Sequence, residues 1–162
     1  MVRRTAALLS QRQESYGYNF TYQEHALHKN WFSAFKSIVI TGISVLVLMS
    51  PLKKLVKPFL PKPGEGPSEE VQENGWFDCK YIVETEDGQK SVFNMSAKGD
   101  PGYRVTSKLV SECALCLIED IDSLPGGDGY GGVLTSASGL GDVLINRLRN
   151  AGISFKGPIL KD

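Results

Sequence analysis

Residues 76–97 read WFDCKYIVETEDGQKSVFNMSA, and this stretch decides the fold that the sequence predicts. Over residues 76–84, apolar and polar side chains alternate with a period close to two, which is typical of a half-buried strand. Asp87-Gly88 supplies a hairpin turn, and the alternation resumes over residues 90–97. The pattern therefore predicts an antiparallel pair of strands.

The residues after the hairpin predict two helices and a last strand. Residues 100–102 (Asp-Pro-Gly) break the alternation, and apolar residues then recur every three or four positions, as on one stripe of a helix: Val105, Leu109, Cys113, Cys116, Leu117 and Ile121. We expect Thr106 or Ser107 to cap this helix and Pro125 to end it. A second helix, closed by Gly152, is marked by Leu140, Val143, Leu144 and Leu148, and residues 153–155 favour a short strand.

The most apolar stretch lies earlier, over residues 37–52, where no residue is charged. A helix over this run would extend about 24 Å, short of the roughly 30 Å hydrocarbon core of a bilayer. We therefore expect a monolayer-embedded or re-entrant anchor, with a buried core segment as the alternative. The predicted anchor residues are the apolar run with its aromatic and basic flanks: Trp31, Phe32, Phe35, Ile38, Val39, Ile40, Ile43, Val45, Leu46, Val47, Leu48, Met49, Lys53, Lys54 and Lys57.

Together these patterns predict an α+β fold, in which a small antiparallel sheet with two helices is preceded by a helical apolar anchor segment. Residues 1–60 form the N-terminal helical region with the anchor, residues 61–75 a linker rich in Pro, Gly and Glu, and residues 76–162 the C-terminal α+β domain. The chain begins with a short helix after Arg3 and Arg4, for which a mitochondrial transit peptide is the alternative.

Charge and cysteine usage exclude several classes of function. Among 162 residues, 18 are Lys or Arg and 18 are Asp or Glu, so no net field favours nucleic acid and we expect no such partner. Three cysteines are too few for a disulfide scaffold and indicate reduced thiols facing the cytosol. Cys113 and Cys116 lie within the helical stripe, so we expect buried thiols packed with Val105, Leu109 and Leu117 against the hairpin. We expect no metal site, because the two histidines, at residues 25 and 28, have only one carboxylate beside them.

Gly127, Gly129 and Gly132 satisfy the spacing G-x-G-x-x-G of a dinucleotide-binding turn. That fingerprint needs a strand before it and a helix starting at it, whereas these glycines follow a predicted helix. We therefore expect no cofactor site in this chain, and the sequence identifies no catalytic residue.

Five segments carry a family resemblance: residues 99–103 (GDPGY), 114–117 (ALCL), 131–135 (GGVLT), 141–148 (GDVLINRL) and 151–155 (AGISF). Their order resembles the C-terminal region of the saccharopine dehydrogenase-like oxidoreductases. The resemblance implies a C-terminal portion of an oxidoreductase, without the Rossmann domain that would bind NAD(P) in a full-length member. It further implies lipid or glycolipid metabolism and a lipid-droplet or membrane surface facing the cytosol, with a mitochondrial or cytoplasmic location as alternatives.

The expected partners are a membrane or lipid-droplet surface and either a missing N-terminal Rossmann domain or a second copy of the chain. The alternative function is a free-standing, membrane-tethered interaction module without catalysis, which would bind through the edge of the hairpin at residues 76–97.

Overall fold

The computed structural model describes residues 1–60, 62, 64–127 and 129–161. The chain divides into two compact units: unit 1 comprises Met1–Phe20 and Pro67–Asp162, and unit 2 comprises Thr21–Gly66. The expected division into domains at residues 60 and 75 stays a prediction. The first helix, α1 (Val2–Gln11), belongs to unit 1 because it packs against a C-terminal helix, and residues 69–74 of the expected linker form α4 (Glu69–Asn74). Pro61 and Pro63 of that linker lie outside the described residues.

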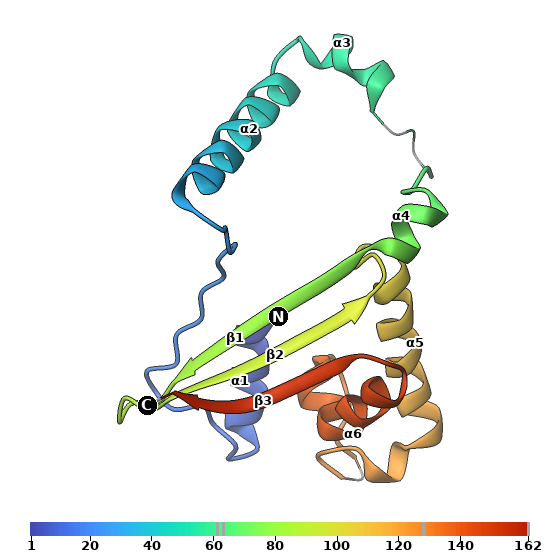
Figure 1. Cartoon of the computed structure of the whole chain (residues 1–162). Coiled ribbons are helices and arrows are strands. Elements are labelled where there is room, and N and C mark those ends of the chain that lie inside the picture. The colour runs from blue at the N-terminus through green and yellow to red at the C-terminus, as the bar shows by residue number, and fades with distance from the viewer. Residues whose placement is uncertain (61, 63, 128, 162) are drawn as a thin grey trace. The chain divides into compact units, whose positions relative to one another are not determined.

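Unit 1 contains a three-stranded antiparallel sheet with the order β1-β2-β3 (Figure 1). Its strands are β1 (Trp76–Glu84), β2 (Lys90–Lys98) and β3 (Ser154–Lys161). The hairpin between β1 and β2 is confirmed, with Trp76 paired to Lys98. Gly88 turns the chain with a φ of 84°, and the Thr85 amide donates to the Gln89 carbonyl at 3.0 Å. The last strand is longer than expected, because it pairs with β2 as far as Lys90.

Two main helices follow the hairpin, α5 (Arg104–Glu119) and α6 (Ser136–Asn150), with the short η2 (Ile121–Ser123) between them. The predicted α+β class is confirmed. The core lies between these helices and one face of the sheet, to which Phe77, Met95 and Phe155 contribute. Its buried residues are Val105, Cys116, Leu140, Leu144, Leu148 and Ile153.

The predicted cap of α5 is wrong. The Thr106 hydroxyl donates to the Pro101 carbonyl at 2.6 Å, and the Ser107 hydroxyl donates to the Arg104 carbonyl at 2.9 Å. The helix begins earlier because the Asp100 carboxylate accepts the Tyr103 amide at 2.7 Å and the Asp100 carbonyl accepts the next turn. Asp favours such local bonds to the backbone, so it starts the helix before the hydroxyl residues.

The predicted end of α6 is confirmed. Gly152 has a φ of 88°, a left-handed conformation that glycine adopts without steric cost. The Gly152 amide donates to the Arg149 carbonyl at 3.0 Å, and the Ile153 amide donates to the Leu148 carbonyl at 2.9 Å. These bonds satisfy the last carbonyls of the helix and direct the chain into β3.

Unit 2 consists of α2 (Trp31–Met49), α3 (Lys53–Val56) and η1 (Lys57–Phe59). The Asn30 side chain caps α2 by accepting the Ser33 amide at 2.8 Å, so the helix begins six residues before the uncharged run. Among the described residues, α2 is the one helix whose length and composition would allow it to cross a membrane, with 19 residues and a mean hydropathy of 2.0. None of its residues is buried.

Candidate functional site

The glycine run lies between η2 and α6, so it follows a helix rather than a strand. At the start of α6 the Thr135 hydroxyl accepts the Ser138 amide at 3.3 Å, and the Ser138 hydroxyl accepts the Thr135 amide at 3.1 Å. A bound pyrophosphate would need such amides at a helix N-terminus to be free. The described residues here therefore do not fit a dinucleotide cofactor. Asp128, within the G-x-G-x-x-G spacing, lies outside them.

Beside the glycine run lies an open cavity of about 650 Å³. Its walls come from the C-terminal half of α5, from η2 and the loop after it, and from the first turns of α6, and most of the lining side chains are apolar. Leu117, Ile121 and Leu124 supply one part of the lining, and Leu134 and Leu140 another. Asp122 is the one carboxylate in this lining among the described residues. The cavity is therefore suited to an apolar ligand rather than to a charged one.

The thiols near this cavity are weak nucleophiles. Cys116 is fully buried, which confirms the expectation for that residue, and Cys113 is half-buried and lines the cavity. Burial raises the pKa of both thiols, and nearby Glu112 raises the pKa of Cys113 further. The predicted packing of Leu117 in the core is wrong, since it is 56% exposed at the end of the α5 stripe. A raised pKa lowers the fraction of thiolate, the nucleophilic form, and so disfavours nucleophilic catalysis by either residue.

Helix α1 holds the segment that carries the cavity's glycines. The Thr5 and Thr135 hydroxyls lie 2.8 Å apart, and both residues are buried. The Arg12 guanidinium donates to the Ser138 carbonyl at 3.0 Å and lies over the Tyr130 ring, 5.1 Å from its centre. Sequence reasoning missed this contact. The available signal was the spacing of Thr5 and Leu8, which places both residues on one face of a helix. Both residues are buried in the structure.

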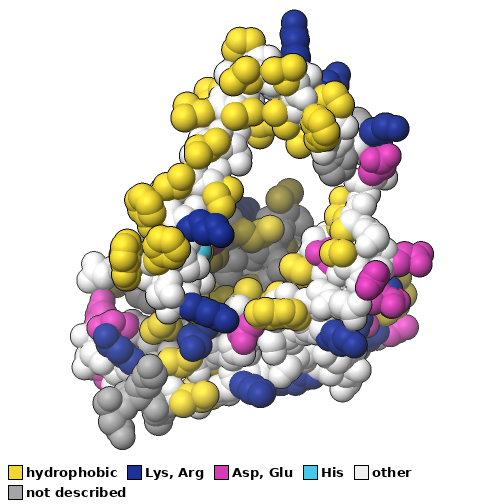
Figure 2. Space-filling view, turned by 45° about the horizontal axis from the view of Figure 1, so that its top comes forward, with side chains coloured by type: hydrophobic (Ala, Val, Ile, Leu, Met, Phe, Trp, Pro, Cys, Tyr) yellow, Lys and Arg dark blue, Asp and Glu magenta, His cyan; other side chains and the backbone are white. Residues whose placement is uncertain are grey.

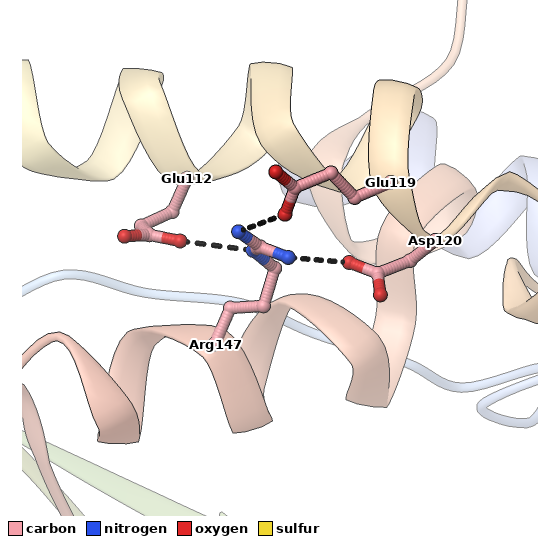
Figure 3. Close-up of polar contacts among 4 residues, drawn as sticks. All are labelled: Glu112, Glu119, Asp120 and Arg147. Atoms are coloured by element: carbon pink, nitrogen blue, oxygen red, sulfur yellow. Dashed lines mark hydrogen bonds and ion pairs between the residues drawn. The ribbon is translucent and has the colours of Figure 1, made fainter.

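A second set of contacts that the sequence did not predict joins α5 to α6 (Figure 3). The Arg147 guanidinium contacts three carboxylates: Nε lies 2.9 Å from Glu112, Nη2 lies 2.9 Å from Glu119, and Nη1 lies 2.8 Å from Asp120. These carboxylates raise the pKa of Arg147 above its usual value, with the Glu112 hydrogen bond as the largest cause. Every guanidinium nitrogen is thus engaged, so Arg147 is a link between helices rather than an anion-binding residue.

The structure places the predicted anchor residues together on α2 and the segment after it. All of them are exposed except Val47, which is half-exposed. His25 and His28 are exposed in unit 2, whereas Cys113 and Cys116 belong to unit 1. Within the described ranges, no group of three His, Cys, Asp or Glu side chains could hold a metal ion.

Comparison with known proteins identifies several relatives that share the same name. The chain is 36% identical over 165 residues to a Mycobacterium tuberculosis protein provisionally named trans-acting enoyl reductase. It is 31% identical over 161 residues to a trans-acting enoyl reductase of Mycobacterium bovis and 29% identical to one of Mycobacterium ulcerans. These relatives are enoyl reductases by name. No family model and no solved structure matches the chain.

The match covers 96% of this chain but only 38% of the M. tuberculosis relative. The chain therefore spans less than two-fifths of the length of the relatives it matches. The names of these relatives show that the resemblance to saccharopine dehydrogenase-like oxidoreductases is wrong. The implied lipid-droplet anchoring and glycolipid metabolism are wrong with it, and the relatives do not support a free-standing interaction module either.

The physical reason for the error lies in the motifs that carried the resemblance. Gly132 has a φ of 120°, Thr135 caps α6, and Gly152 closes the same helix. Turns and helix ends select these residue types in any fold that needs them. The motifs therefore indicate local backbone geometry rather than membership of one family. A role in oxidoreduction is compatible with the relatives' names.

Proposed function

We propose that this chain serves enoyl reduction as the part of such an enzyme that binds the apolar portion of the substrate. The supporting observation is its 36% identity, over 96% of the chain, to a relative named for that activity. The hydride donor then binds to another part of the complete enzyme, because the glycine run of this chain does not fit a dinucleotide.

Enoyl reduction adds a hydride and a proton across a C=C bond conjugated to an acyl carbonyl. NAD(P)H is the hydride donor that we expect for the complete enzyme. The role of this chain is to bind the acyl tail and exclude water from it. A volume of about 650 Å³ lies within the range of small-molecule sites, and the leucine and isoleucine lining matches an acyl tail.

Gly131 offers a direct test of the cavity, because it lines the space and a Cβ there would meet no atom within 4 Å. We expect the full chain to bind a fluorescent fatty acid, and a medium-chain trans-2-enoyl thioester to displace it. Gly131→Trp should fill the cavity and abolish this binding, whereas Gly131→Ala should retain it. Equal binding by the Gly131→Trp variant would refute the cavity as the acyl site.

The activity itself is testable in a chimera. The region of the M. tuberculosis relative that matches this chain is exchanged for the chain, and NADPH oxidation with the enoyl thioester is followed by absorbance. We expect activity that Gly131→Trp removes and Gly131→Ala preserves. A folded chimera that binds NADPH but reduces no enoyl thioester contradicts the proposed function.

Self-association of this chain stays a separate prediction, which sedimentation velocity would test.

A further inference from the structure

Unit 2 exposes many large apolar side chains. No residue of α2 is buried, and Trp31, Leu46 and Met49 are each at least 70% exposed. Figure 2 shows hydrophobic side chains covering the segment that carries α2 and α3. Such surfaces mark sites of interaction with lipid or protein. We propose that unit 2 binds an anionic phospholipid bilayer, with α2 lying in the plane of one leaflet.

The charge of unit 2 selects a phospholipid surface as the partner. Residues 21–66 contain six lysines and two glutamates, a net charge of +4, although the whole chain is neutral. The lysines are Lys29, Lys36, Lys53, Lys54, Lys57 and Lys62. None of them pairs with a carboxylate in the part of the chain that the structure describes. Free lysines beside an apolar helix are complementary to anionic headgroups.

The path of the chain excludes a simple crossing by α2. The segments on both sides of unit 2 belong to the same compact unit 1, so both ends of unit 2 must lie on one side of a membrane. A helix that crossed would need a second crossing over residues 50–66. Those residues carry four lysines, and α2 is the one span candidate among the described residues. The helix therefore lies along the surface.

The pattern of polar residues on α2 agrees with this orientation. Ser33, Ser37, Thr41 and Ser44 follow one another at spacings of four, four and three, which places them along one side of the helix. The Ser44 hydroxyl donates to the Ile40 carbonyl at 2.8 Å. Lys36 adjoins this side, three positions after Ser33, and bulky apolar residues such as Phe35 and Leu46 lie opposite. The hydroxyl side then faces the headgroups, and the apolar side enters the leaflet.

The first test compares two glutamate variants of the full chain in flotation with preformed vesicles. Thr41 and Leu46 are both exposed, so neither substitution disturbs packing within the protein. We expect Leu46→Glu to weaken binding by about tenfold or more, because it removes a leucine that would be buried in the leaflet and places a charge there. Thr41→Glu adds the same charge on the headgroup side and should change binding much less.

Vesicles of phosphatidylcholine alone should bind less than vesicles that also contain phosphatidylglycerol, and added salt should reduce the difference. Equal loss of binding in both glutamate variants, or binding that ignores lipid charge, would overturn the proposal. The same holds if the chain self-associates through α2 and does not float with either vesicle.

The second test measures depth. The Trp76→Phe variant reports from Trp31 alone, and adding Trp31→Phe and Leu46→Trp moves the single tryptophan to residue 46. Quenching by lipids brominated at defined acyl positions gives the depth of each tryptophan. Along the helix these two positions are about 22 Å apart. A helix in the plane of the leaflet places both at similar depth. A much deeper position for residue 46 would show a crossing helix and overturn the proposed orientation.

Discussion

The Thr135 hydroxyl joins two helices and caps one of them, so its removal gives the sharpest test of how unit 1 is held together. Thr135→Val keeps the shape of the side chain and removes the hydroxyl. The loss of the bond from the Ser138 amide, at 3.3 Å, should cost about 1 kcal/mol, as for other helix caps. Thr5 loses a buried partner at 2.8 Å, which should cost about 1–2 kcal/mol more.

We therefore expect Thr135→Val to lower the free energy of unfolding by about 2–3 kcal/mol. The measurement is urea unfolding of the full chain in mild detergent, followed by far-ultraviolet circular dichroism. Ser136→Ala, at the exposed next residue, is the matched control and should change the free energy by less than about 0.5 kcal/mol.

Combining Thr135→Val with Thr5→Val isolates the bond between α1 and α6. The double-mutant cycle should give a coupling energy of about 1 kcal/mol, because each single variant already removes the shared bond. A coupling near zero, with Thr135→Val as mild as Ser136→Ala, would refute the docking of α1 on α6.

Two further predictions concern the core of unit 1. Cys116→Ser should destabilise the chain by about 1–2 kcal/mol more than Cys116→Ala does, because the buried site offers a hydroxyl no good partner. Thermal unfolding of both variants measures this difference. Thiol labelling that is faster at Cys116 than at exposed Cys79 would contradict the burial of Cys116. Gly141→Ala should lower the free energy of unfolding in urea by at least about 1 kcal/mol, because residue 141 has a φ of 48° and a Cβ there would lie 3.1 Å from the Pro125 ring. An unchanged midpoint of urea unfolding would contradict this conformation of Gly141.

The elements that local patterns specify were predictable. The hairpin followed from alternation and an Asp-Gly turn, and the end of α6 followed from Gly152. The contact of Thr5 with Thr135 joins residues 130 positions apart, and no local pattern signals such a pair. The ion pairs of Arg147 likewise depend on how α5 packs against α6. The cavity beside the glycine run depends on the same packing, so the sequence could not predict it.

The net charge of the whole chain conceals a difference between its two units. Unit 2 carries a net charge of +4, so the remaining residues of this neutral chain carry −4. An anionic surface therefore attracts unit 2 and repels unit 1.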